Sequence, residues 1–203
     1  MKHRHRGTFL LLSAGATLIA AALPGCGGNG DSGGSTGLPG GAATRSQVLH
    51  GRYLVTAVAD CTGCHQGNNN PNDPTFLSGY RTGGQSGSFP IGPFTTYAAN
   101  LTQDKATGIG SWSAQDIFNA LRNGKDPAGK YLCPPMPWTT FRNMTDDDIW
   151  SIAAYLQTLK PVTNKVPDSQ GPPGTDGKPD WSSAYAHLTS LPAYPASDEG
   201  VVQ

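Results

Sequence analysis

One five-residue segment limits what this chain can fold into more than any other feature. Residues 61–65 read Cys-Thr-Gly-Cys-His, the C-x-x-C-H pattern through which a haem is attached covalently to a protein. Two thiols three positions apart, at a turn that starts a helix, can each add to one vinyl group of the same haem. The histidine that follows then lies beneath the iron. We therefore predict one haem c, with Cys61 and Cys64 as thioether anchors and His65 as the proximal iron ligand.

Other kinds of site also use paired cysteines, and two of them are alternatives here. A thioredoxin-like redox dithiol is expected within an alternating strand, helix and strand pattern, which the sequence around the motif lacks. A zinc site needs a second pair of ligands. Apart from the motif, the chain that follows a predicted leader offers only His50, His187 and one further internal cysteine, Cys133. These alternatives are weaker than haem attachment.

The N-terminal residues are typical of an export signal. A basic start precedes an apolar run from Thr8 to Leu23, shorter than the roughly 20 residues that cross a bilayer, so residues 1–25 are predicted to be a signal peptide. Leu23-Pro24-Gly25-Cys26 resembles a bacterial lipobox, in which Cys26 carries the lipid; the alternative is ordinary secretion with a free Cys26. The Gly/Ser-rich residues 26–43 suit a flexible tether. We expect a lipid-anchored protein of the bacterial cell envelope, on the periplasmic side.

Composition excludes several classes of protein. The chain has 203 residues, of which 27 are glycine and 17 are proline without a three-residue repeat, so collagen and long coiled coils are excluded. Its formal net charge is zero and it has no basic run beyond the N-terminus, which argues against nucleic acid as a partner. A fold with long loops is expected.

Periodicity and capping signals predict three helices. The first covers Ser46 to about Asp60, with an apolar side made of Val48, Leu49, Leu54, Val55 and Val58. The second begins at Ser113, which can form a capping box with Asp116, and ends near Asn123-Gly124. The third is capped by Thr145, has three aspartates in its positive first turn, and ends at Lys160-Pro161.

The remaining chain lacks a convincing period. Residues 66–99 are predicted to be a long loop wrapped around a cofactor. The Pro-rich residues 161–203 are predicted to be an extended C-terminal tail.

Two methionines compete for the second axial position of the iron. Met136 lies between prolines, which hold the backbone extended and suit a loop that presses a thioether against iron. Met144 stands just before the third helix, where a hydrophobic staple is the better interpretation. Met136 is therefore the predicted distal ligand. A Met/His pair raises the reduction potential and leaves no open position for a substrate.

With these segments in view, the chain resembles single-haem class I cytochromes c, in particular the cytochrome c domains in cytochrome subunits of bacterial membrane-bound dehydrogenases. The resemblance runs from about Ser46 to Val162 and rests on these ordered blocks: 51–54 leading into 61–65, then 100–104, 107–113, 135–138 and 144–149. It implies an all-α cytochrome c fold, with three main helices around one covalent haem, long loops and extended tails. The domain itself would span residues 44–160. The resemblance also implies an electron carrier with no catalytic residues of its own, which exchanges electrons with redox partner proteins.

Four further residues are candidates for haem contacts. Asn100 and Arg142 are suited to bind haem propionates by hydrogen bond or charge. Trp112 and Trp138 are suited to line the haem pocket, although plain core packing would explain them as well. The alternative function is a five-coordinate haem protein, either a sensor that binds a small ligand or a haem enzyme, in which Met136 is merely structural. An accessory subunit whose partner does the chemistry is a third possibility.

Overall fold

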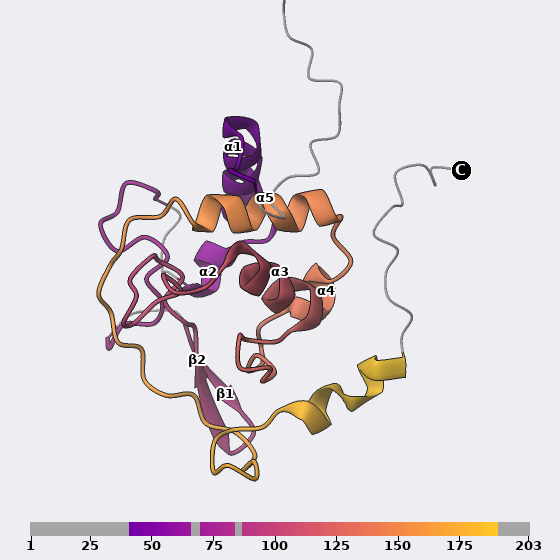
Figure 1. Cartoon of the computed structure of the whole chain (residues 1–203). Helices are drawn as coiled ribbons and strands as arrows, with labels where there is room; N and C mark the ends of the chain where they lie inside the picture. The colour runs from indigo at the N-terminus through magenta and orange to yellow at the C-terminus, as the bar shows by residue number, and fades with distance from the viewer. Residues whose placement is uncertain (1–40, 66–69, 84–86, 191–203) are drawn as a thin grey trace, which may run out of the picture. The chain divides into compact units, whose positions relative to one another are not determined.

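Two helices far apart in the sequence, α1 (Arg45–Tyr53) and α5 (Asp146–Leu156), pack across one another, as Figure 1 shows. The structure is a computed structural model that describes residues 41–65, 70–83 and 87–190. A Cβ atom at Gly51 would lie 1.8 Å from the carbonyl oxygen of Ser151, so only glycine permits this approach of the two backbones. Because residues 149–156 of α5 are all buried, this helix lies at the centre of the core.

The first predicted helix is present but changes its winding before the cysteine motif. Thr44 forms a capping box with Gln47 at the start of α1, and a π-helical turn, η1 (Leu54–Val58), continues the helix. Of the predicted apolar side, Leu54 and Val55 are buried, whereas Leu49 and Val58 are about half exposed. The prediction was wrong for these two residues. Leu49 is exposed because α1 approaches α5 through Gly51 instead. Val58 is exposed because the wider π turn rotates it away from the face that a regular helix would bury.

The two other predicted helices begin at the caps assigned to them. Ser113 and Asp116 form a reciprocal capping box at α3 (Ala114–Asn123), and Gly124 ends it in the left-handed conformation. Thr145 caps α5 by accepting a hydrogen bond from the backbone N–H of Asp148. Two short helices accompany them, α2 (Cys61–His65) at the motif and α4 (Trp138–Phe141), of which α4 was not predicted.

Two stretches predicted to be irregular contain regular structure. Strand β1 (Ser88–Ile91) pairs antiparallel with β2 (Phe94–Tyr97), with Ser88 opposite Tyr97, inside the predicted long loop. A 3₁₀ helix, η2 (Ser182–Ser190), lies in the predicted extended tail. The expectation of unbroken loop and tail was wrong at these segments, because Pro90 within β1 and the prolines of the tail hide the local pattern.

Buried side chains gather in two groups. The main cluster joins residues of η1, α3 and α5 with Cys61, and Trp112, Met136 and Met144 pack against it from its edge. The tail cluster consists of Trp138, Trp181 and Tyr185, with partly buried neighbours at Ile91, Phe94, Tyr131, Leu132, Cys133 and Leu188. The fold thus has a core around the motif and a separate aromatic group that includes the C-terminal segment.

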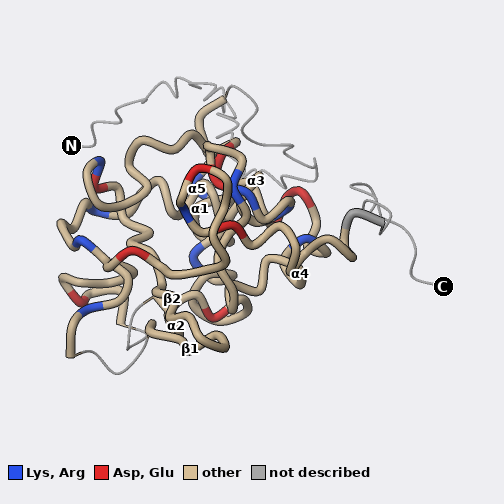
Figure 2. Tube along the Cα trace, turned by 90° about the horizontal axis from the view of Figure 1, so that it is seen from below, with Lys and Arg blue, Asp and Glu red and all other residues tan. Residues whose placement is uncertain are grey.

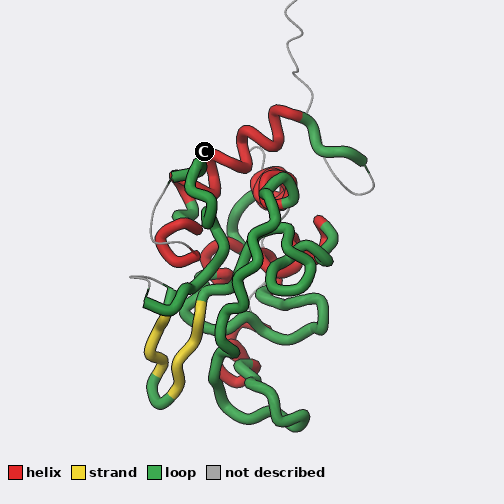
Figure 3. Tube along the Cα trace, turned by 90° about the vertical axis from the view of Figure 1, so that its left-hand side faces the viewer, coloured by secondary structure: helices red, strands yellow, loops and turns green. Residues whose placement is uncertain are grey.

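Much of the described chain is loop and turn, as Figure 3 shows, and its acidic and basic residues are interspersed along the trace (Figure 2). No helix in the described ranges combines the length and the apolar character needed to span a bilayer. The predicted signal peptide, Cys26, tether residues 26–40 and tail residues 191–203 lie outside the described residues.

Candidate functional site

Helix α2 presents the three residues of the motif on one side. Cys61, Cys64 and His65 stand at positions i, i+3 and i+4, which share a face of a helix. Cys61 belongs to the main cluster and His65 is 7% exposed, whereas Cys64 is only partly buried. The turn that begins the helix is fixed by Asp60, whose backbone and side-chain oxygens both accept a hydrogen bond from the Gly63 N–H. The motif therefore sits between the core and the surface.

The ring of His65 is oriented by a backbone carbonyl. Its Nδ1 lies 2.7 Å from the carbonyl oxygen of Ala99 and donates a hydrogen bond to it, which leaves Nε2 with the free lone pair. Within the described part of the chain, no residue forms a hydrogen bond with Nε2. Burial lowers the pKa of His65, and the hydrogen bond to Ala99 opposes this effect only in part. A neutral imidazole with Nε2 available is the form that binds iron.

The cysteines of the motif have the properties of anchors. Cys61, Cys64 and Cys133 are all free thiols, so no disulfide joins the described cysteines. Burial raises the pKa of Cys61 to about 12 and also raises the pKa of Cys64. A redox-active dithiol needs the opposite, a thiol whose pKa is depressed to favour the reactive thiolate. The structure thus gives no support to the thioredoxin-like alternative.

Met136 lies in a proline-rich segment that touches the core. Its side chain is partly buried against the main cluster, the same group of residues that contains Cys61. Its backbone N–H donates to the carbonyl oxygen of Cys133 at 3.2 Å, and Thr96 Oγ1 donates to the carbonyl oxygen of Pro134 at 2.5 Å. Met144 also packs against the main cluster, from the position before the Thr145 cap of α5. Both methionines reach the same core, so the choice of Met136 as ligand stays a prediction.

The side chain of Asn100 forms its hydrogen bonds within the protein. Its Nδ2 donates to the carbonyl oxygen of Val162 at 2.8 Å and to Thr107 Oγ1 at 3.2 Å, and its Oδ1 accepts from both the backbone N–H and the hydroxyl of Thr102. The amide is 2% exposed and its donors are already used within the protein. Asn100 thus ties the segment after Ala99 to the chain that follows α5, and its contact with a haem propionate stays a prediction.

The other predicted contacts are distributed over both clusters. Trp112 packs against the main cluster, on the side of the motif. Trp138 instead belongs to the tail cluster, where it stacks on Tyr131 and meets Tyr185 edge to face. Arg142 follows α4, and its backbone carbonyl accepts a hydrogen bond from Arg122. Within the described residues, no acidic side chain pairs with the Arg142 guanidinium, whose contact with a propionate stays a prediction.

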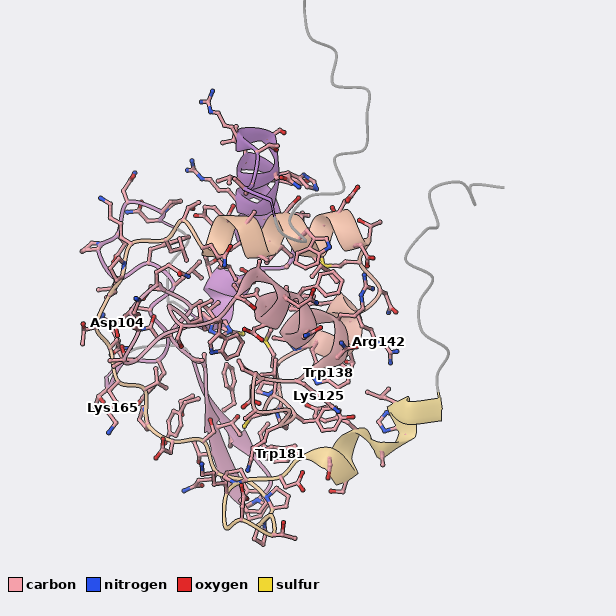
Figure 4. The ribbon with its side chains drawn as sticks, viewed as in Figure 1. Asp104, Lys125, Trp138, Arg142, Lys165 and Trp181 are labelled. Carbon is pink, nitrogen blue, oxygen red and sulfur yellow. The ribbon has the colours of Figure 1, made fainter. Side chains whose placement is uncertain are left out.

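Sequence reasoning missed the group that orients His65. The carbonyl of Ala99 is a backbone atom, and no side-chain pattern marks it. It also missed Trp181, which lies between the hairpin and Trp138 in Figure 4 and packs edge to face on Phe94. A lone tryptophan in a Pro-rich stretch carries no periodic signal.

Comparison with known proteins agrees with this geometry, because residues 49–160 match the family described as Cytochrome c. The chain belongs to the cytochrome c family. It is 37% identical over 131 residues to the fructose dehydrogenase cytochrome subunit of Gluconobacter japonicus, a match that covers 64% of this chain and 25% of that protein. It is 35% identical over 134 residues to the cytochrome c subunit of the quinone alcohol dehydrogenase of Gluconobacter oxydans, with 64% and 26% covered. A third relative, the gluconate 2-dehydrogenase cytochrome c subunit of Pantoea cypripedii, is 34% identical over 133 residues, with 64% and 27% covered.

This cytochrome c spans about a quarter of the length of these curated relatives. Its family implies one covalent haem c, and the residues present fit that group. The His65 ring is neutral and held by Ala99, and two free thiols lie on the same side of α2. The prediction of a haem from the pentapeptide is confirmed.

Proposed function

We propose that this cytochrome c carries single electrons, with its haem held between His65 and Met136, as the electron-transfer component of a membrane-bound dehydrogenase. The observation that carries the proposal is the His65 ring at the end of the cysteine motif: its Nδ1 hydrogen bond to Ala99 fixes the orientation of the ring, and burial lowers its pKa and so favours the neutral form. The names of the relatives support the role in a dehydrogenase, since all three are cytochrome subunits of dehydrogenases, named for fructose, alcohol and gluconate. The substrate and the partner subunits of this chain are part of the proposal.

The bound haem supplies the one-electron chemistry through its iron. The protein's residues hold it and shield it. His65 would offer a ring nitrogen to the iron, and the thioether of Met136 would offer a neutral sulfur ligand. The main cluster, to which Cys61 belongs, keeps water away from the buried side of the site. A thioether ligand and an apolar surrounding both raise the reduction potential.

Electrons would leave the site near Cys64. This residue is only partly buried, unlike Cys61, so the thioether that it forms lies close to the surface. Three large apolar side chains on the helix that leads to the motif are also exposed: Leu49, Tyr53 and Val58. Exposed apolar side chains suit brief contacts with a redox partner, and Val58 lies on η1, the turn that contacts α2.

Absorption spectra of the purified holoprotein test the proposal. We expect a low-spin spectrum in both oxidation states, a methionine–iron charge-transfer band when the protein is oxidised, and no change when carbon monoxide is added to the reduced form. The reason is that two strong axial ligands leave the iron no open position. A high-spin spectrum that shifts with carbon monoxide would instead support the five-coordinate sensor or enzyme.

We further propose that Cys26 anchors the protein to a membrane on the periplasmic side of the cell envelope. The support is the lipobox-like Leu23-Pro24-Gly25-Cys26 and the Gly/Ser-rich segment after it, which is long enough to hold a domain off a lipid surface. Intact-mass measurement of the membrane fraction should give a chain that begins at Cys26 and carries acyl chains. A chain that begins at Cys26 without acyl mass, or one found only in the soluble fraction, would refute the anchor.

A further inference from the structure

The chain that follows α5 contacts both the segment that ends at Asn100 and the segment that contains Met136, although it lies beyond the residues 49–160 that match the family. It first binds the side that holds His65. Asn164 Nδ2 donates to the carbonyl oxygens of Ser78 at 2.7 Å and of Tyr80 at 2.9 Å. Next to it, the carbonyl oxygen of Val162 accepts from Asn100, the neighbour of Ala99. This first part of the segment is therefore bound to residues 78–80 and to Asn100, which follows the Ala99 that orients His65.

The middle of the segment runs along the free edge of the hairpin. The backbone N–H of Gln170 donates to the carbonyl oxygen of Thr95, and its side-chain oxygen accepts from the Thr95 N–H, both at 2.9 Å. The Tyr97 N–H donates to Ser169 Oγ at 2.9 Å. Residues 169–170 thus pair with the outer edge of β2. They connect the part of the chain near His65 with the part that packs on residues 133–138, the methionine segment.

The end of the segment packs on the residues that bracket Met136. Tyr185 meets Trp138 edge to face, with ring centroids 5.0 Å apart, and Trp181 meets Phe94 edge to face at 5.8 Å. Cys133 joins the same tail cluster, and its thiol faces the Trp181 indole and the Ser169 hydroxyl. Figure 4 shows Trp181 on the hairpin side of Trp138. The residue three positions before Met136 and the residue two positions after it are thus both packed with this segment.

We propose that Trp181 and Tyr185 are positioning residues that hold residues 133–138 in place and thereby keep the Met136 thioether on the iron; this inference rests on the proposed His/Met ligation. The methionine segment is anchored from two directions. Its side chain at Met136 packs inward on the main cluster, while Cys133 and Trp138 pack outward on the tail cluster. Without the outward contacts, the segment between α3 and α4 would sample more conformations, in some of which the sulfur has left the iron.

The test compares the full-length holoprotein with Trp181→Ala and Trp181→Phe. Carbon monoxide binds reduced iron only when the methionine has left, so its binding rate reports the fraction of molecules with an open segment. We expect Trp181→Ala to raise this rate about tenfold, since the rate follows the population of the open form, and to weaken the methionine–iron charge-transfer band. Trp181→Phe should restore both values, because the indole N–H has no hydrogen-bond partner of normal geometry among the described residues and the ring itself makes the contact.

Two further variants separate positioning from general stability. Thr44→Ala removes the capping box at the start of α1, outside both clusters, and should lower the midpoint of denaturation without changing the carbon monoxide rate. Tyr185→Ala removes the edge-to-face contact with Trp138 and should also raise the carbon monoxide rate. This variant serves as the test if Trp181→Ala cannot be purified as holoprotein. An unchanged rate and band in both tail variants, or a Thr44→Ala rate that rises as much, would overturn the inference. If the wild-type protein lacks the band and binds carbon monoxide freely, the proposed ligation is what fails.

Discussion

Replacing Cys61 and Cys64 together by alanine should abolish covalent haem. The two thiols are the only cysteines on α2, and each is predicted to form one of the thioether bonds. The loss should extend to stability, because a haem would bury apolar surface against the core and Cys61 is part of the main cluster. We expect no haem mass in the intact chain, no haem stain on a denaturing gel, and a less cooperative thermal transition.

Cys133→Ala provides the matched control for the double variant. Cys133 is also a free, partly buried cysteine, but it lies in the tail cluster beside Trp181. This variant should retain one covalently attached haem at the wild-type yield. Covalent haem in the Cys61→Ala/Cys64→Ala chain, or its loss in Cys133→Ala, would contradict the assignment of the anchors.

The second large effect is expected at Met136. Met136→Ala should leave haem attached, remove the methionine–iron charge-transfer band completely, and allow carbon monoxide to bind to the reduced protein. The reduction potential should fall as well, since the thioether is the ligand that raises it. The cost in folding stability should be modest, about 2 kcal/mol, because the lost side chain is only partly buried.

Met144→Ala is the control that makes this experiment decisive. Both methionines are partly buried and both pack against the main cluster, so their removal should have similar effects on packing. Only replacement of the methionine that binds the iron should change the absorption spectrum. If Met144→Ala loses the band and Met136→Ala keeps it, the distal ligand has been assigned to the wrong methionine.

The helices could be predicted where their signals are local. Ser113 with Asp116, Gly124 and Thr145 each satisfy backbone groups within a few residues, and these caps hold in the structure. The hairpin at residues 88–97 could not be predicted, because its edge is stabilised by residues 169–170, more than seventy positions later. The π-helical turn before the motif also has no sequence signature, which is why half exposure of Val58 was unexpected.

The site shows the same division between local and distant information. The pentapeptide predicts the anchors and the proximal histidine because their chemistry depends on spacing alone. The partner of His65 could not be predicted, since any backbone carbonyl can accept its hydrogen bond and only the fold brings Ala99 to it. The partners of Asn100 could not be predicted for a related reason: its amide can donate to many acceptors, and the chain after α5 supplies one of them, the carbonyl oxygen of Val162.

The contact of Gly51 with Ser151 divides α1 into two sides under very different evolutionary constraint. At position 51 even one methyl group would overlap the backbone of α5, so selection should remove every substitution there. Leu49 and Tyr53 lie about half exposed on the same helix and face no such restriction. Related cytochromes are therefore free to change the outward side of this helix, and with it the proteins that they meet, while the glycine beneath preserves the path of the chain to the haem.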